Sequence, residues 1–360
     1  MSETVLYRKY RPQKFKDVVG QDHIVDVLQE AIKLGNISHA YLFSGSRGTG
    51  KTSIARIFAR EIGTSENDLY EIDAASNRGI DDVREIRDGV NVLPFESKYK
   101  VYIVDEVHML TKDAFNALLK TLEEPPAHAI FILATTELDK VLDTVISRCQ
   151  AFVFKKPTQK ILKDLVAKVA KKEGFELDSA SADLIALLGD GSFRDAFGIL
   201  QKVIGSSSDK KIGIDEVELV TGAPKKSIVN NFVQAIDARD AARGLSAVRA
   251  ASGANIDMGV FLKLALHKLR AVMLLRYSPD MRDALAEEFS AEDFALLGEL
   301  AKGAAAPAAG AAANTVSGIS SKAILALLRA GDQLRFSPIS ELPLELALIE
   351  LSDAQSLPKA

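Results

Sequence analysis

Residues Gly45-Ser46-Arg47-Gly48-Thr49-Gly50-Lys51-Thr52 match the pattern G-x-x-x-x-G-K-T of a phosphate-binding loop. An apolar, β-rich run precedes it at residues 40–43, and an amphipathic helical pattern begins at Ser53. In such a strand–loop–helix unit the glycines let successive backbone N–H groups point at phosphate oxygens, and the helix dipole adds to the attraction. All eight residues of the loop are therefore predicted to surround the phosphates of a nucleotide.

Two side chains of this loop have separate predicted roles. Lys51 is expected to reach the β- and γ-phosphates, and the Thr52 hydroxyl is expected to hold Mg²⁺. The alternative is a glycine-rich turn that carries an exposed lysine. All the fixed positions of the pattern are present between a strand and a helix, and this context favours the phosphate-binding interpretation.

A second element ends in the two carboxylates Asp105 and Glu106, directly after the apolar run at residues 101–104. A buried strand with this ending is typical of a Walker B element. Asp105 is then expected to bind Mg²⁺ through water, and Glu106 to polarise an attacking water molecule. The alternative is an ordinary strand end with two solvated acids, which is the weaker interpretation downstream of a phosphate-binding loop.

The first 156 residues alternate between strand and helix patterns. The five predicted strands are residues 40–43, 69–73, 99–104, 130–134 and 152–154. The clearest helix covers residues 112–124, with Thr111 as its N-cap and Pro125-Pro126 at its end. This alternation predicts a parallel sheet covered by helices on both faces. Residues 158–220 indicate several short helices, and residues 223–353 are rich in helical Ala/Leu patterns, interrupted by a predicted flexible loop at 302–318.

Composition limits the function further. The chain has 360 residues, of which 47% are apolar and 26% charged, as expected of a soluble protein of about two or three domains. It has no apolar run that could span a membrane and no secretory signal, so we expect it in the cytoplasm. The net charge of −4 means that any nucleic-acid contact must be local or shared among subunits. The single cysteine, Cys149, excludes an internal disulfide and a four-thiolate zinc site, no HExxH motif favours catalytic zinc, and no base for a Cys149 nucleophile is evident.

Further segments match one family. They are residues 10–12, 15–21, 71–77, 105–110, 114–126, 134–137, 147–149 and 191–196. With the phosphate-binding loop, they make nearly the whole chain resemble the gamma/tau subunits of the bacterial DNA polymerase III clamp loader, which are AAA+ ATPases. The resemblance implies an AAA+ core with a five-stranded parallel sheet at residues 1–156, a helical lid at 157–221 and a helical collar for ring assembly at 222–360.

The resemblance also implies a function. The chain would be an ATPase that uses ATP and Mg²⁺ to open a sliding clamp and load it onto primer–template DNA, within the polymerase holoenzyme. Implied partners are delta and delta-prime type subunits, further copies of the same chain, the clamp and the DNA, with no membrane.

Individual residues receive roles from the resemblance. Thr136 is similar to sensor 1, which reports on the γ-phosphate, and Arg194 to sensor 2, which reaches the nucleotide from the lid. Arg148 resembles the arginine finger that acts on ATP bound by a neighbouring subunit. Val19 lies in the segment that packs against adenine in the family. The plainer alternatives are a surface ion pair for Arg148, a helix-capping charge for Arg194 and a simple core position for Val19.

The chain departs from the family in two places. The family's four zinc-binding cysteines are missing from the interval at residues 63–68, so no zinc is expected. The loop at 302–318 resembles an insertion in the third domain. The resemblance ends soon after residue 351, so we expect the tau-specific extension, which contacts polymerase and helicase, to be absent.

Two other functions are compatible with parts of the sequence. A different AAA+ machine, such as a Holliday-junction motor or an archaeal-type clamp loader, is disfavoured by the runs at residues 105–110 and 114–126. A non-catalytic scaffold subunit is disfavoured because the predicted catalytic set is intact, namely Lys51, Thr52, Asp105, Glu106 and Arg148.

Overall fold

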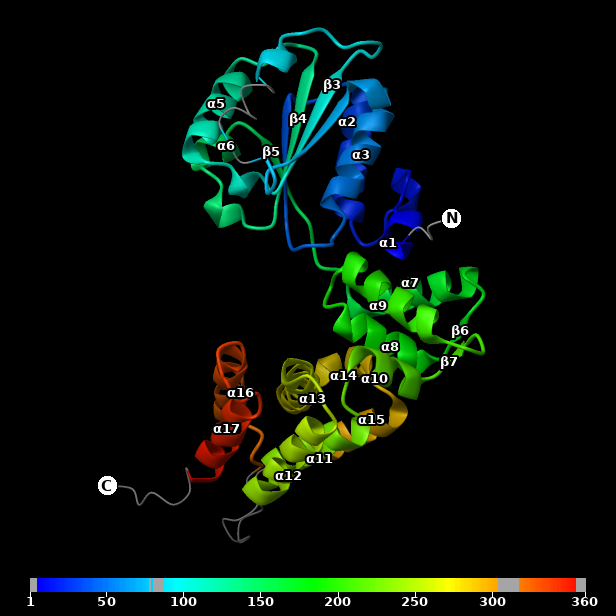
Figure 1. The fold of residues 1–360 in the computed structure, drawn as a ribbon, viewed down its shortest axis with the longest axis vertical. Helices are drawn as coiled ribbons and strands as arrows, with labels where there is room; N and C mark the ends of the chain where they lie inside the picture. Colours follow the sequence, from blue (N-terminus) through cyan, green and yellow to red (C-terminus); the bar gives the residue numbers. More distant parts are fainter. Residues whose placement is uncertain (1–4, 78, 80–86, 304–316, 354–360) are drawn as a thin grey trace, which may run out of the picture. The chain divides into compact units, whose positions relative to one another are not determined.

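The computed structural model describes residues 5–77, 79, 87–303 and 317–353 (Figure 1). Most of the loop predicted at residues 302–318 therefore lies outside the described residues. The chain divides into two compact units. The first comprises residues 1–169 and 189–201, and the second comprises residues 170–188 and 202–360. The predicted division into core, lid and collar stays a prediction.

The first unit is built on a five-stranded sheet with the strand order β2-β3-β4-β1-β5. Its strands are β1 (Ala40–Ser44), β2 (Leu69–Asp73), β3 (Lys100–Asp105), β4 (Ala129–Thr135) and β5 (Gln150–Val153). Every neighbouring pair is parallel, which confirms the predicted sheet. The last predicted strand, at residues 152–154, was placed too late, because pairing with β1 already begins at Gln150, opposite Tyr41.

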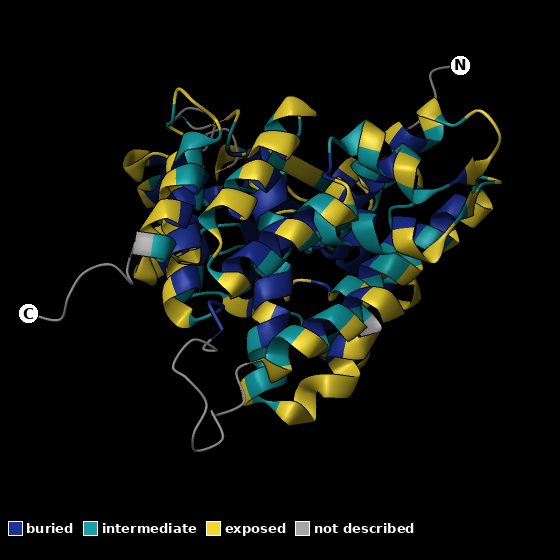
Figure 2. Ribbon diagram, turned by 90° about the horizontal axis from the view of Figure 1, so that it is seen from below, coloured by how far each residue is buried: buried dark blue, intermediate teal, exposed yellow. Residues whose placement is uncertain are grey.

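Helices cover both faces of this sheet, as predicted (Figure 1). On one face α2 (Asp22–Leu34) and α3 (Lys51–Glu61) pack on Tyr41 and Phe43 of β1. On the other face α5 (Lys112–Glu123) and α6 (Asp143–Ile146) pack on a core that includes Ala40 and Leu42. Successive side chains of β1 thus enter opposite cores, which is why its sequence is continuously apolar. Buried and exposed residues alternate around the individual helices (Figure 2).

The end caps of α5 agree with the sequence. Thr111 Oγ1 accepts a hydrogen bond from the Ala114 N–H at 3.3 Å, so the predicted N-cap is confirmed. The helix stops at Glu123, ahead of Pro125-Pro126. The described N-terminal segment adds α1 (Leu6–Lys9) and the 3₁₀ turn η1 (Phe15–Asp17).

The second unit is largely helical. Its helices are α8 (Ser179–Leu188), α10 (Ile214–Thr221), α11 (Lys226–Ala238), α12 (Ala241–Gly253), α13 (Met258–Tyr277), α14 (Arg282–Glu288), α15 (Ala291–Lys302), α16 (Ser321–Leu334) and α17 (Leu342–Asp353). Phe261 and Leu269 of α13 share one core with Phe232 of α11 and Leu327 of α16. A short parallel pair, β6 (Glu176–Leu177) and β7 (Lys211–Ile212), was not predicted, since two-residue strands leave no period in a sequence. The helices α7 (Gln159–Lys172) and α9 (Phe193–Ser206) contain residues of both units.

No helix among the described residues combines the length and apolar character that crossing a bilayer demands.

A buried carboxylate, that of Asp68, organises the interval at residues 63–68, which contains no cysteine. Asp68 ends the 3₁₀ turn η2 (Glu66–Asp68) and is fully buried. It accepts hydrogen bonds from the backbone N–H groups of Phe95 (2.5 Å), Glu96 (3.0 Å) and Ser97 (2.8 Å). Burial alone would raise the pKa of Asp68, but these hydrogen bonds outweigh it and hold that pKa well below its usual range. The charged side chain therefore ties the turn before β3 to the segment after α3.

We predict that Asp68→Ala lowers the free energy of unfolding by about 1–3 kcal/mol at neutral pH, because three backbone donors lose a charged acceptor. The pKa of Asp68 is lower in the folded than in the unfolded chain. The stabilisation is therefore complete above the unfolded pKa of about 4 and is lost as the pH falls below it. Thermal unfolding of both proteins should show a difference in Tm at pH 7 that shrinks toward pH 3.

Glu66→Ala is the matched control, because the Glu66 side chain is 89% exposed and its ion pair with Arg60 spans 3.7 Å. An Asp68→Ala protein that melts with the wild type at pH 7 would show that the carboxylate does not hold this turn.

Candidate nucleotide site

The loop between β1 and α3 needs glycine at several positions. Gly45, Gly48 and Gly50 have φ values of 144°, 75° and 105°, in the region that other residues rarely adopt. A Cβ on Gly45 would lie 2.6 Å from the Phe154 carbonyl oxygen, and one on Gly48 would lie 2.0 Å from Ser192 Oγ. The glycines of this pattern are thus explained by their backbone conformation and by the close approach of other segments of the same chain. Gly50 is also the N-cap of α3, so the helix starts directly at Lys51.

Lys51 is held inside the loop. Its Nζ donates hydrogen bonds to the carbonyl oxygens of Gly45 (2.7 Å) and Ser46 (3.0 Å), and the residue is 6% exposed. Burial lowers the pKa of Lys51, while the nearby carboxylates of Glu106 and Asp105 act in the opposite direction. The cation is therefore partly desolvated beside the N-terminus of α3, where an anion gains most from it.

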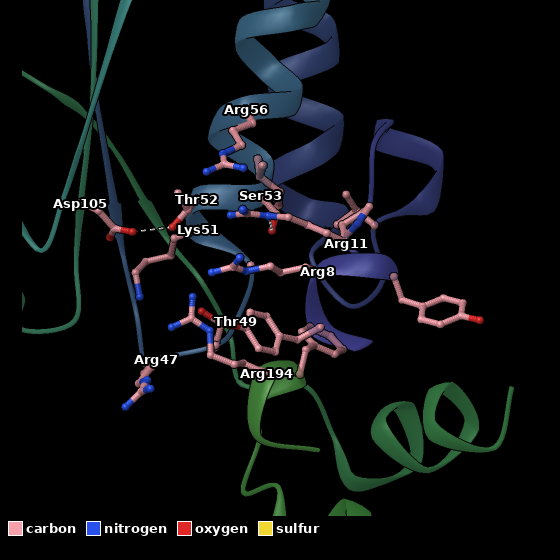
Figure 3. Close-up of a pocket in the computed structure, with 18 of the residues that line it drawn as sticks. Arg8, Arg11, Arg47, Thr49, Lys51, Thr52, Ser53, Arg56, Asp105 and Arg194 are labelled. Atoms are coloured by element: carbon pink, nitrogen blue, oxygen red, sulfur yellow. Dashed lines mark hydrogen bonds between the residues drawn. The ribbon is translucent and has the colours of Figure 1, made fainter. Parts of the chain in front are cut away.

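The two predicted magnesium ligands lie together. Thr52 Oγ1 donates a hydrogen bond to Asp105 Oδ2 at 2.7 Å (Figure 3). A hydroxyl and a carboxylate are oxygen ligands of the kind that Mg²⁺ accepts, and Mg²⁺ commonly completes its shell with phosphate oxygens and water. Among the described residues no group of three or more His, Cys, Asp and Glu side chains is arranged to bind a metal. The predicted absence of zinc stays a prediction that metal analysis can test.

Glu106 and Thr136 are brought together although they are far apart in the sequence. Glu106 Oε2 accepts hydrogen bonds from the Thr136 hydroxyl (2.8 Å) and the Thr136 N–H (3.2 Å). The contact exists because β3 and β4 are parallel neighbours whose carboxyl ends meet at one edge of the sheet. Glu106 itself has φ 50° and ψ 45°, so its backbone is left-handed.

Most of the loop, together with Asp105 and Glu106, lines a cavity of about 870 Å³, whereas Thr136 is not among its lining residues. Its volume is in the range of small-molecule sites. The lining includes Arg47–Thr52, Asp105 and Glu106, and also Val19 and Arg194. Val19 is 41% exposed and faces the cavity, so it is not a core residue. Arg194 lies in the first turn of α9 with its guanidinium carbon 5.6 Å from the centre of the Tyr7 ring, in cation–π contact.

Arg148 is not among the residues that line this cavity. Its guanidinium contacts Glu123 Oε1 at 2.7 Å and the Thr144 carbonyl oxygen at 2.6 Å. The side chain is 34% exposed. Arg148 therefore lies outside the site of its own chain.

Three arginines that line the cavity, Arg8, Arg11 and Arg56, were not predicted as site residues. Arg8, Arg11 and Arg194 reach toward the same space from the N-terminal segment and from α9 (Figure 3). Arg11 Nε donates to Ser53 Oγ at 2.9 Å, and Arg56 pairs with Glu71. Burial, and then the nearby charge of Arg56, lower the pKa of Arg11 to about 10. The sequence held a signal for Arg56, since it follows Thr52 by four residues and so shares its face of α3.

A cavity with many cations, a hydroxyl–carboxylate pair and a helix N-terminus suits a triphosphate with Mg²⁺. Comparisons with known proteins agree with this chemistry. A family model described as the delta subunit of DNA polymerase III matches residues 20–75 and 64–158. The DNA polymerase III subunit tau of Bacillus subtilis is 40% identical over 320 residues, which cover 83% of this chain and 57% of that protein. The subunit tau of Escherichia coli is 36% identical over 78% of this chain and 46% of that protein.

This chain belongs to the gamma/tau family of DNA polymerase III subunits. It spans about half the length of the curated relatives it matches. Among solved structures, the RuvB Holliday junction branch migration motor of Thermotoga maritima is similar with a TM-score of 0.51 and 22% identity, over 63% of this chain and 79% of that chain. That likeness is one of fold and confirms the predicted AAA+ architecture. The rival assignment to a branch-migration motor thus has no support beyond the shared fold.

We predict that Lys51→Ala weakens binding of a fluorescent ATP analogue by about 10-fold to 100-fold, the range of a lost hydrogen bond to a charged group. Glu106→Gln should bind the analogue with near wild-type affinity, because it keeps the side-chain volume and leaves the phosphate-binding loop intact. Lys33→Ala, at a lysine whose side chain is 78% exposed, is the control for loss of charge alone. Equal affinities for Lys51→Ala and Lys33→Ala would refute the assignment of the loop.

Proposed function

We propose that this chain is an ATP-hydrolysing motor subunit of the DNA polymerase III clamp loader, which opens the sliding clamp and loads it onto primer–template DNA. The observation that supports this most is the contact of Thr52 with Asp105 at the mouth of the phosphate-binding loop. Membership of the gamma/tau family supplies the context for that site.

The residues of the site suit hydrolysis of ATP by water. The backbone of Gly45–Thr52 and the Lys51 ammonium would hold the β- and γ-phosphates, while Val19 lies where the base could pack. Thr52 would bind Mg²⁺ directly and Asp105 through water, and the ion supplies positive charge to the phosphate oxygens. Glu106 would polarise the attacking water, and Thr136, which donates a hydrogen bond to Glu106, would sense the γ-phosphate through that contact.

Two arginines would complete the charge balance of the reaction. Arg194 lines the cavity of its own chain, which supports a sensor 2 role. Arg148 lies outside it, which supports action on the nucleotide of a neighbouring subunit. Its ion pair with Glu123 is half exposed and worth about 0–1 kcal/mol, so Arg148 can leave it for a phosphate at little cost.

The proposed partners follow the family. They are delta and delta-prime type subunits, further copies of this chain, the sliding clamp and primer–template DNA, in the cytoplasm. The net charge of −4 neither supports nor excludes DNA contact, and it fits a contact that is divided among several subunits.

A direct test measures ATPase activity of the purified chain with and without partner subunits, clamp and primed DNA. The proposal expects stimulation by clamp plus primed DNA and none by four-way junctions. A chain that assembles but never hydrolyses ATP would be a scaffold.

The proposed finger gives a sharper prediction. An arginine supplied across an interface can be worth about 10³–10⁵ in rate. Arg148→Ala should therefore bind ATP normally and lose the stimulated ATPase of the assembly. Because Arg148→Ala keeps the loop and Lys51→Ala keeps the finger, a mixture of the two should form some complete interfaces and regain part of the activity. Wild-type turnover by Arg148→Ala alone in the full assembly would rule out the finger.

A further inference from the structure

One histidine lies directly behind Glu106. His108 is in the 3₁₀ turn η3 (Val107–Met109), and its side chain is 5% exposed. Its Nδ1 lies 2.9 Å from Thr135 Oγ1 and 3.5 Å from Glu106 Oε2. Its Nε2 lies 3.3 Å from Glu137 Oε1. One buried ring therefore contacts the end of β3 and the segment that follows β4.

Both ring nitrogens of His108 have polar neighbours. Nδ1 shares a hydrogen bond with Thr135 Oγ1, which also accepts a hydrogen bond from the Glu137 N–H at 3.0 Å. On the other side of the ring, Nε2 lies within ion-pair distance of the Glu137 carboxylate. Glu137 is anchored in turn by Lys140 Nζ at 2.6 Å. The ring thus has a partner at both nitrogens.

Glu106 depends on such support. Its carboxylate oxygen Oε2 lies between two donors of Thr136 on one side and the His108 ring on the other. The ring and Thr136 therefore contact the same carboxylate oxygen of Glu106, whose backbone is left-handed, with φ 50°.

We infer that His108 is a positioning residue for Glu106. Through the His108 ring, the position of residues 135–140 determines the position of the Glu106 carboxylate, which polarises water. This inference rests on the proposed function, because it takes Glu106 as the group that acts on water. His108 touches Glu106 and does not line the cavity, so it acts through Glu106 and not on the substrate.

Two other roles for His108 fit the structure less well. A metal site would need further ligands, and the described part of the chain has no group of three that could bind an ion. A base that takes the proton from water would have to reach the cavity, and a ring that is 5% exposed behind Glu106 does not.

The test compares His108→Leu with His108→Gln in the full assembly with clamp and primed DNA. Leucine keeps the bulk and loses every hydrogen bond, whereas the glutamine amide keeps a nitrogen donor and adds an oxygen acceptor at the end of the side chain. His108→Leu should lower kcat by about 10-fold to 100-fold, the cost of a small misplacement in an active site. The Kd of an ATP analogue should stay within about twofold, and His108→Gln should recover part of kcat.

A double mutant separates a relay from a local defect. Glu137→Gln should lower kcat less than His108→Leu does. Adding Glu137→Gln to His108→Leu should then change kcat no further, because Glu137 acts through the histidine. His128→Leu is the matched control, since His128 is a partly buried histidine whose Nε2 bonds to the Val90 carbonyl oxygen at 2.9 Å and which does not line the cavity. It should leave kcat and Kd unchanged.

The outcomes distinguish the two claims. Wild-type kcat in His108→Leu, or parallel losses of kcat and nucleotide affinity, would overturn the positioning role and leave the proposed function standing. Absence of ATPase in the wild-type assembly would end both. If thermal unfolding shows that His108→Leu does not fold, His108→Gln and Glu137→Gln decide, and unchanged kcat in both overturns the inference.

Discussion

The hydrogen bond from Thr52 to Asp105 connects the first turn of α3 to the end of β3, and the remainder of the site is arranged around it. It can form only because β1 and β3 end at the same edge of a parallel sheet, with β4 between them. The same arrangement places Thr136, after β4, against Glu106, after β3. In open parallel sheets this edge is where ligands bind, since the strand order leaves a crevice there.

Charge explains what this edge is suited to bind. Six cationic side chains line the cavity, namely Arg8, Arg11, Arg47, Lys51, Arg56 and Arg194. Burial and mutual repulsion lower the pKa of Arg11 to about 10, and burial lowers the pKa of Lys51. Both shifts mean that holding these charges close together, and partly buried, costs the folded chain free energy. A triphosphate relieves that cost, so its binding is favoured by electrostatics that exist before it arrives.

The sequence predicted those features that depend on short-range spacing. The phosphate-binding loop, the strands and the Thr111 cap of α5 could be predicted, because each depends on the types and spacing of a few neighbouring residues. Contacts between residues far apart in the sequence could not be predicted. Arg11 and Ser53 are 42 residues apart, and Glu106 and Thr136 are 30 apart, so their contacts follow from the order of strands and not from any local pattern. His108 lies beside the two acids in the sequence, where a structural role was the expectation, but its contacts with Thr135 and Glu137 could not be predicted, because these partners lie at the end of β4 and just after it. The roles of Thr136, Arg148 and Arg194 were predicted from the resemblance to a family. The structure shows where each of these side chains lies and does not test its role.

We propose that each chain forms one nucleotide site from its own loop, with Thr52 and Asp105 as the magnesium ligands. Isothermal titration of ATP into the purified chain, with Mg²⁺ and then with a chelator in its place, measures this. We expect saturable binding of one ATP per chain that weakens markedly without Mg²⁺. Absence of saturable binding, or an affinity that does not respond to Mg²⁺, would contradict it.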